Sequence, residues 1–150
     1  MAQAATRNRP LSPHLQIWRW GWAMTVSILH RVSGNGLAFG GLGILLWWLG
    51  ALASGPEAYA TFTSWMWADL AQLQWSGAGA IFASLVKIVL KLVLIGVSWA
   101  FFNHMSSGLR HFVLDIGAGY ELDTNTRWSM LTIVAGVLLT IVFWAALLYR

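Results

Sequence analysis

Three polar residues stand close together in an otherwise apolar stretch of the chain: Ser27, His30 and Arg31. Ser27 and Arg31 are four residues apart and would share one face of a helix, with His30 beside that face. If this stretch crosses a membrane, an arginine at the bilayer centre costs about 2.5–3.5 kcal/mol on insertion scales, so its charge needs compensation. The simpler alternative is that Arg31 extends to lipid phosphates while Ser27 bonds its own backbone. The spacing nevertheless favours a small cationic pocket that can hydrogen-bond a polar ligand.

A second set of polar residues follows a helical spacing of i, i+4, i+7 and i+11, and it consists of His104, Gly108, His111 and Asp115. Neutral imidazole is a good ligand for haem iron, and a glycine one turn away leaves room for a flat macrocycle. His104 is therefore the candidate axial ligand, with Gly108 beside the haem. The alternative for His104 is a hydrogen bond between helices. His111 lies near the end of the apolar stretch, where it would contact either a haem propionate or lipid headgroups.

The composition requires a membrane protein: 58% of the 150 residues are hydrophobic, 9% are charged, and 11 are tryptophan. The absence of cysteine excludes disulfides, zinc-thiolate sites and any iron–sulfur cluster held by this chain. Redox chemistry in this chain would have to use haem, quinone or flavin. The net charge of +4 is small and dispersed, which argues against a nucleic-acid partner.

Long apolar runs predict three transmembrane helices over residues 22–53, 79–112 and 128–149, each long enough for the roughly 20 residues that cross a bilayer. We expect an all-α, integral membrane three-helix bundle in which residues 1–150 form a single membrane-anchor domain. Residues 1–21 contain Pro10 and Pro13, which oppose helix, and tryptophans typical of an interfacial segment. In the loop after the first span, residues 64–70 predict a short helix on the membrane surface.

The distribution of basic residues predicts the orientation of the bundle. The arginines near the first span precede or enter it, and they are Arg7, Arg9, Arg19 and Arg31. The first loop, residues 54–78, carries only the acidic residues Glu57 and Asp69. The N-terminus is therefore expected inside and the C-terminus outside. Lys87 and Lys91 oppose this orientation unless their long side chains extend outward.

The two candidate sites lie at one depth in this arrangement. With a rise of 1.5 Å per residue, His104 lies about 9 Å outward from Arg110, while Ser27 and Arg31 lie about 7 and 13 Å outward from Trp22. An iron ligand and a cationic pocket in the same inner half of the bilayer suit a haem with its propionates, next to a quinone head group.

On three ordered motifs, the chain resembles the cytochrome b556 subunits of succinate dehydrogenase (respiratory complex II). The motifs are Arg9-Pro10-Leu11-Ser12-Pro13-His14-Leu15 with Ile17 and Arg19, then Ser27-Ile28-Leu29-His30-Arg31-Val32-Ser33-Gly34, and finally His104 with Gly108-Leu109-Arg110-His111 and Asp115. The resemblance covers residues 9–34 and 104–115, with compatible length and span number. Trp18 departs slightly, because tyrosine is common at that position in the family.

The resemblance implies that His104 ligates haem b and that a second membrane-anchor subunit supplies the other axial histidine. It implies that Ser27 and Arg31 form part of the ubiquinone pocket beside the iron–sulfur subunit, with His30, Arg31 and His111 near the haem propionates. FAD and iron–sulfur clusters would belong to the flavoprotein and iron–sulfur subunits, so the chain would not bind succinate and would not be active alone. The expected location is a bacterial inner membrane rather than a mitochondrial one.

Two other functions remain open from the sequence. One is a haem-free scaffold or transporter subunit in which the buried histidine and arginine residues pair across helices. The other is a self-contained b-type cytochrome in which His30 supplies the second axial ligand. His104 and His111 cannot both bind one iron, because they are about 10 Å apart along one helix.

Overall fold

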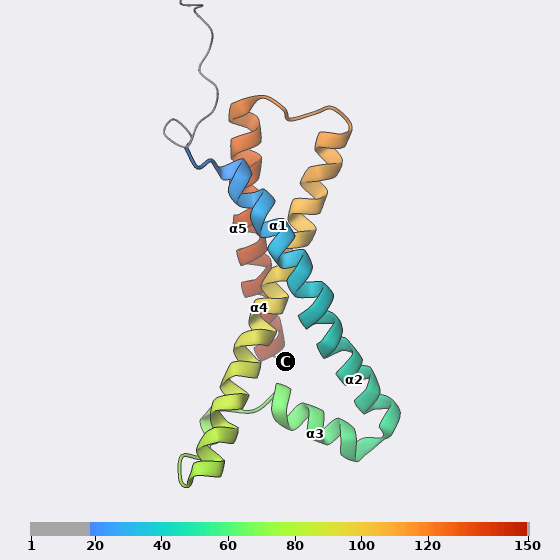
Figure 1. Cartoon of the computed structure of the whole chain (residues 1–150), viewed down its shortest axis with the longest axis vertical. Coiled ribbons are helices and arrows are strands. Elements are labelled where there is room, and N and C mark those ends of the chain that lie inside the picture. The colour runs from blue at the N-terminus through green and yellow to red at the C-terminus, as the bar shows by residue number, and fades with distance from the viewer. Residues whose placement is uncertain (1–18, 150) are drawn as a thin grey trace, which may run out of the picture.

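The computed structural model describes residues 19–149, and this part of the chain is helical without strands (Figure 1). Its helices are α1 (Trp22–Gly36), the π-helical η1 (Leu37–Gly41), α2 (Leu42–Ser54), α3 (Pro56–Met66), the 3-10 turn η2 (Leu70–Gln72), α4 (Ala78–Asp115) and α5 (Leu122–Leu148). Residues 1–18, which hold the first motif and most of the expected interfacial segment, lie outside the described residues, as does Arg150.

Three helical segments are long and apolar enough to cross a membrane: Trp22–Ser54, Ala78–Asp115 and Leu122–Leu148. The all-α class and the three spans expected from the sequence are therefore confirmed. The third helix begins at Leu122 rather than near residue 128, because hydropathy marks the apolar run and not the polar first turns. Asp123 in the first turn of α5 suits a helix start, since the positive end of the helix dipole attracts a carboxylate.

The first span leans across α4 and then separates from it (Figure 1). α1 packs against both α4 and α5, and the π-helical η1 continues along α4. At Gly40 and Gly41 an added Cβ would lie 3.9 and 3.7 Å from the side chain of Val97, so these glycines face α4 closely. An added Cβ at Gly36 or Gly43 would meet nothing within 4 Å. Of these four glycines, Gly40 and Gly41 therefore serve the packing of the first span against α4, and Gly36 and Gly43 do not.

The surface helix in the first loop is α3, which begins and ends earlier than residues 64–70. Gly55 has a φ of 104°, a left-handed conformation that favours glycine, and Pro56 then begins the helix at a position where its missing N–H costs nothing. Phe62 and Met66 of α3 are buried against Ala51 of α2. The earlier start thus follows from a Gly-Pro start signal and from burial of apolar side chains.

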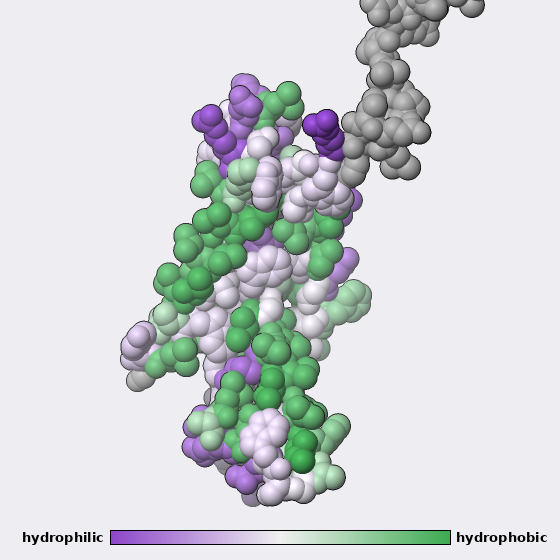
Figure 2. Space-filling view, turned by 90° about the vertical axis from the view of Figure 1, so that its left-hand side faces the viewer, coloured by the Kyte–Doolittle hydropathy of each residue, from purple (hydrophilic) through white to green (hydrophobic). Residues whose placement is uncertain are grey.

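Helices α4 and α5 pack through small and polar side chains. An added Cβ at Gly136 would lie 3.0 Å from the Cα of Asn103, so the two backbones approach closely. Ser129 and Thr132 are buried in this interface and donate their hydroxyl hydrogens to backbone carbonyls of α5. Apolar side chains instead cover much of the outer surface of the spans, and hydrophilic residues gather toward the two ends of the molecule (Figure 2).

The two lysines that opposed the predicted orientation lie against tryptophans. The Lys91 ammonium is 5.3 Å from the ring centroid of Trp67 and 5.8 Å from that of Trp144. Lys87 lies 5.7 Å from the ring centroid of Trp65. These distances are those of cation–π contacts, which offset part of the cost of placing an ammonium beside apolar helices.

Candidate functional site

Three imidazole rings meet where α1 packs against α4. The ring of His30 on α1 stacks on that of His104 on α4, with 4.0 Å between centroids and 9° between planes. His111 lies about two turns after His104 on α4. The centroid of its ring is 5.2 Å from that of His30, with 55° between the two ring planes. Helix packing therefore brings together three of the site residues predicted from the sequence.

The ring of His104 is held by the backbone of α1. Its Nδ1 lies 3.1 Å from the carbonyl oxygen of His30, and because a carbonyl only accepts, Nδ1–H is the donor. The hydroxyl of Ser33 lies 3.4 Å from the same nitrogen and donates to the same carbonyl at 3.1 Å. A proton on Nδ1 leaves a lone pair on Nε2, which is the form of imidazole that binds iron.

Two glycines near this ring differ in their surroundings: Gly34 packs against the ring, and Gly108 faces open space. An added Cβ at Gly34 would lie 2.8 Å from Cε1 of His104, so Gly34 forms a cradle that only a residue without Cβ allows. At Gly108, one turn after His104, an added Cβ would meet nothing within 4 Å. An imidazole protonated on Nδ1, with open space over Gly108 one turn along the same helix, fits a haem ligand, and the residues present therefore suit the group.

Ser27 and Arg31 lie on α1 close to this cluster in sequence, and they remain apart from it in contacts. Ser27 is partly buried and Arg31 is exposed. Within residues 19–149 neither side chain forms a hydrogen bond or an ion pair. The ring contacts of the cluster are between His30 and the other two histidines, and they do not include Ser27 or Arg31. Their assignment to a quinone pocket stays a prediction.

A buried polar stripe on α4 was not recognised as such from the sequence. Asn103, Ser107 and Arg110 are 1%, 0% and 7% exposed. The Arg110 guanidinium donates through Nη2 to the side-chain oxygen of Asn125 on α5. From the sequence, Arg110 stands only near the inner end of the second span and within the third motif. Its spacing of i, i+4 and i+7 with the other two residues could have revealed the stripe, one position before the histidine stripe.

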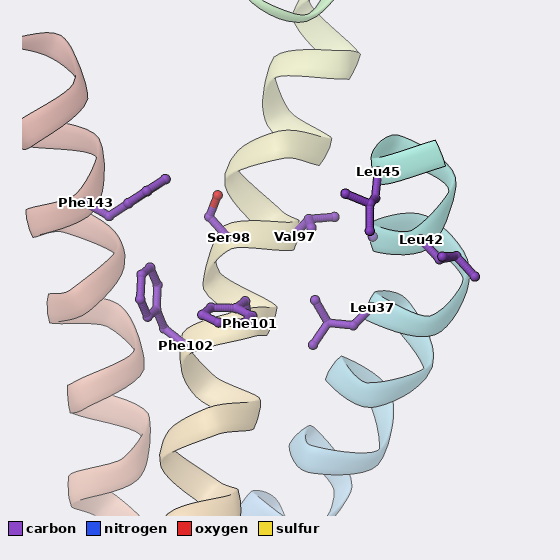
Figure 3. Close-up of a pocket in the computed structure, with 9 residues that line it drawn as sticks. Leu37, Leu42, Leu45, Val97, Ser98, Phe101, Phe102 and Phe143 are labelled. Atoms are coloured by element: carbon purple, nitrogen blue, oxygen red, sulfur yellow. The ribbon is translucent and has the colours of Figure 1, made fainter. Parts of the chain in front are cut away.

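A large cavity lies between η1, α2 and α4, next to α5 (Figure 3). Its volume is about 530 Å³, and its walls include Leu37, Leu45, Val97 and Phe102. The hydroxyl of Ser98 points into this region, and it donates to the carbonyl of Leu94 at 2.8 Å. The cavity thus suits apolar chains rather than a redox head group.

Comparison with known proteins decides the family. Residues 5–143 match the family model described as the succinate dehydrogenase/fumarate reductase transmembrane subunit. The chain belongs to this family. A succinate dehydrogenase cytochrome b556 subunit from Paracoccus denitrificans is 33% identical over 141 residues, covering 94% of this chain and 93% of the relative. The protein of the same name from Rickettsia felis is 31% identical over 142 residues, covering 95% of each chain.

Mitochondrial members of the family are also similar. The mitochondrial succinate dehydrogenase cytochrome b560 subunit of Sus scrofa is 31% identical over 131 residues, which cover 87% of this chain and 67% of the relative. The bacterial relatives thus match this family member over nearly their full length, while the mitochondrial one is longer.

Proposed function

We propose that this chain is the haem b-binding membrane anchor of a bacterial inner-membrane succinate:ubiquinone oxidoreductase. The observation that carries the proposal is the geometry of His104, whose Nδ1–H donates to the carbonyl of His30 and leaves Nε2 free to bind iron. Relatives named as cytochrome b subunits support this choice of ligand chemistry. A scaffold subunit would also use the hydrogen bond from His104 to α1, so the naming of the relatives as cytochrome b subunits is what favours haem binding over a scaffold.

The chain's own residues would hold haem b on the α1–α4 face. His104 would hold the haem iron through Nε2, and Gly108, without a side chain, would leave room beside it. The Arg31 guanidinium and the ring N–H groups of His30 and His111 would be the donors available to the haem propionates. When bound, the haem supplies a one-electron carrier within the membrane.

Ser27 and Arg31 would serve ubiquinone, the electron acceptor. As the quinone oxygens gain electrons, Arg31 stabilises the developing negative charge and Ser27 donates a hydrogen bond to it. The remaining walls of the pocket would come from the iron–sulfur subunit and the second membrane-anchor subunit.

The other redox groups would lie on partner subunits. A chain without cysteine holds no iron–sulfur cluster, so the clusters would belong to the iron–sulfur subunit. FAD would belong to the flavoprotein subunit. Succinate would be oxidised there, and this chain would have no activity alone.

The stacking of His30 on His104 bears on the self-contained cytochrome. In a self-contained cytochrome, His30 and His104 would both hold the haem iron, each through a ring nitrogen. Here the two rings stack face to face at 4.0 Å, so they would have to separate before both could hold one haem. This arrangement supports a second axial histidine from the other membrane subunit.

Paired substitutions test the proposal. In the complex purified with its partner subunits, His104→Ala should abolish or strongly perturb the low-spin b-type absorbance, because the iron loses an axial ligand. His30→Ala should leave a nearly normal low-spin spectrum. An unchanged spectrum in His104→Ala would remove it as the ligand, and equal damage by both variants would favour the self-contained cytochrome.

A further inference from the structure

One turn of α1 surrounds the ring of His104. Gly34 lies against the edge of the ring, because an added Cβ at this glycine would be 2.8 Å from Cε1 and 3.2 Å from Nδ1 of His104. Ser33, only 3% exposed, places its hydroxyl 3.4 Å from the same Nδ1. His30 adds its carbonyl at 3.1 Å and its stacked ring. The ring is therefore bounded by α1 on its edge, at its nitrogen and on one face.

An alanine at position 34 would require either the His104 ring or the backbone of α1 to move. A contact of 2.8 Å between a Cβ and a ring carbon is closer than carbon atoms pack, and the atom in the way belongs to a ring that cannot fold aside as an alkyl chain does. The hydrogen bond from Nδ1 to the His30 carbonyl restrains the ring further. Relief would therefore require the imidazole to tilt or α1 to move away from α4.

We propose that Ser33 and Gly34 are positioning residues that set the orientation of the iron-binding imidazole of His104 from the neighbouring helix. Gly34 sets the closest approach of α1 to the ring, and Ser33 orients the carbonyl–Nδ1 contact that selects the tautomer. The proposal rests on the proposed function, because it matters only if His104 binds iron. Hydrogen bonds to the distal nitrogen of a metal-bound histidine tune ligand basicity, so the potential of the bound group would respond to them.

The main test compares Gly34→Ala with Gly36→Ala in the complete complex. Both glycines lie on α1, and both substitutions favour helix, but an added Cβ at Gly36 meets nothing within 4 Å. Gly34→Ala should lower the haem content per complex severalfold or shift the low-spin electron paramagnetic resonance signal and the haem midpoint potential. Gly36→Ala should leave all three unchanged. An unchanged signal, potential and haem content in Gly34→Ala would overturn the proposal.

If the Gly34→Ala complex fails to assemble, two less disruptive substitutions at Ser33 test the positioning role. Ser33→Ala removes one hydroxyl without adding volume, and Ser33→Thr retains it. Ser33→Ala should shift the midpoint potential while the complex keeps its haem, and Ser33→Thr should restore the potential toward the parent value. A merely structural role for Ser33 would leave the potential unchanged in assembled Ser33→Ala, and that result would then overturn the proposal.

The two hypotheses fail separately. If His104→Ala keeps an unchanged low-spin spectrum, the proposed function fails and the positioning role fails with it. If His104→Ala loses the spectrum while Gly34→Ala and Ser33→Ala resemble the parent complex, only the positioning role is wrong.

Discussion

Ser27 and Arg31 are the residues whose function depends most on chemistry outside this chain. Ser27 is partly buried and Arg31 exposed on α1, four residues apart, and within the described residues their side chains are free to face a ligand or a partner subunit. A guanidinium and a hydroxyl on one helix face suit a small molecule that becomes negatively charged during its reaction. Their predicted role can be separated from assembly by kinetics.

Ser27→Ala and Arg31→Leu should each impair ubiquinone reduction and spare the earlier steps. Losing a hydrogen bond to a charged group costs about 1.5–3 kcal/mol, which corresponds to a fall of roughly ten- to a hundredfold in quinone turnover. The measurement is succinate-dependent turnover with ubiquinone and, in parallel, with a soluble dye that accepts electrons upstream. Arg31→Lys should rescue only partly, because an ammonium lacks the planar guanidinium fork. Equal loss of both activities would instead indicate an assembly defect.

Arg110 and Asn125 form a buried charge-assisted contact between α4 and α5. Asn125→Ala would leave a buried guanidinium without this partner, so we expect it to destabilise the complex by about 1.5–3 kcal/mol. Arg110→Met should cost less, because it removes the charge along with the contact. Thr126→Ala on the same turn is the matched control, since its hydroxyl bonds only the carbonyl of Leu122. Thermal unfolding midpoints at one scan rate compare the three, and an Asn125→Ala midpoint equal to the control would contradict the prediction.

At the scale of elements, the arrangement of the site depends on how closely α4 approaches its neighbours. Its histidine face meets α1, while its Asn103, Ser107 and Arg110 face meets α5. The two stripes begin at consecutive residues and therefore lie about 100° apart around the axis of α4, so a rotation of that size would exchange their partners. Close backbone contact at Gly136 restricts that rotation, because the two helices meet with almost no side chain between them.

Gly136→Ala should weaken the α4–α5 pair. The added methyl would lie 3.0 Å from the Cα of Asn103, which is a backbone atom and cannot move without shifting the helix. Overpacking of this kind costs about 1–3 kcal/mol. Gly43→Ala is the control, since it also lies in a transmembrane helix and an added Cβ there meets nothing within 4 Å. The amount of assembled complex in membranes and its thermal midpoint provide the measurement; a Gly136→Ala complex as abundant and stable as Gly43→Ala would refute the close contact.

At the scale of the whole molecule, the predicted orientation places the α3 end outside and the α4–α5 loop inside. The lysines that disagree with it, Lys87 and Lys91, are engaged by tryptophans near the α3 end. Cation–π contacts stabilise an ammonium at a membrane boundary, so these two lysines are a weaker argument for placing the α3 end on the inner side, where positive charge is otherwise enriched. We therefore expect the distribution of arginines to set the orientation.

Reporter fusions test this orientation directly. A reporter that is active only outside the inner membrane should be active when fused after Tyr149 and inactive when fused in the loop at Ala118. The reverse pattern would mean that the positive-inside argument fails for this chain. Fusions in the α2–α3 connection at Gly55 should match those after Tyr149, because both lie on the same side of a three-span topology.

The sequence alone determined the three membrane spans, the candidate ligand His104 and the family resemblance, because hydropathy and motif spacing are local properties of the chain. It did not reveal that α3 begins at Pro56. The Gly-Pro pair permits a helix start there, but the helix is stabilised by burial of Phe62 against α2, which is a tertiary contact. Only the tertiary structure decided that the His30 carbonyl and Gly34 enclose His104, and that Arg110 meets Asn125. Helical periodicity defines the faces of α4, but the crossing of whole helices determines which face meets which neighbour.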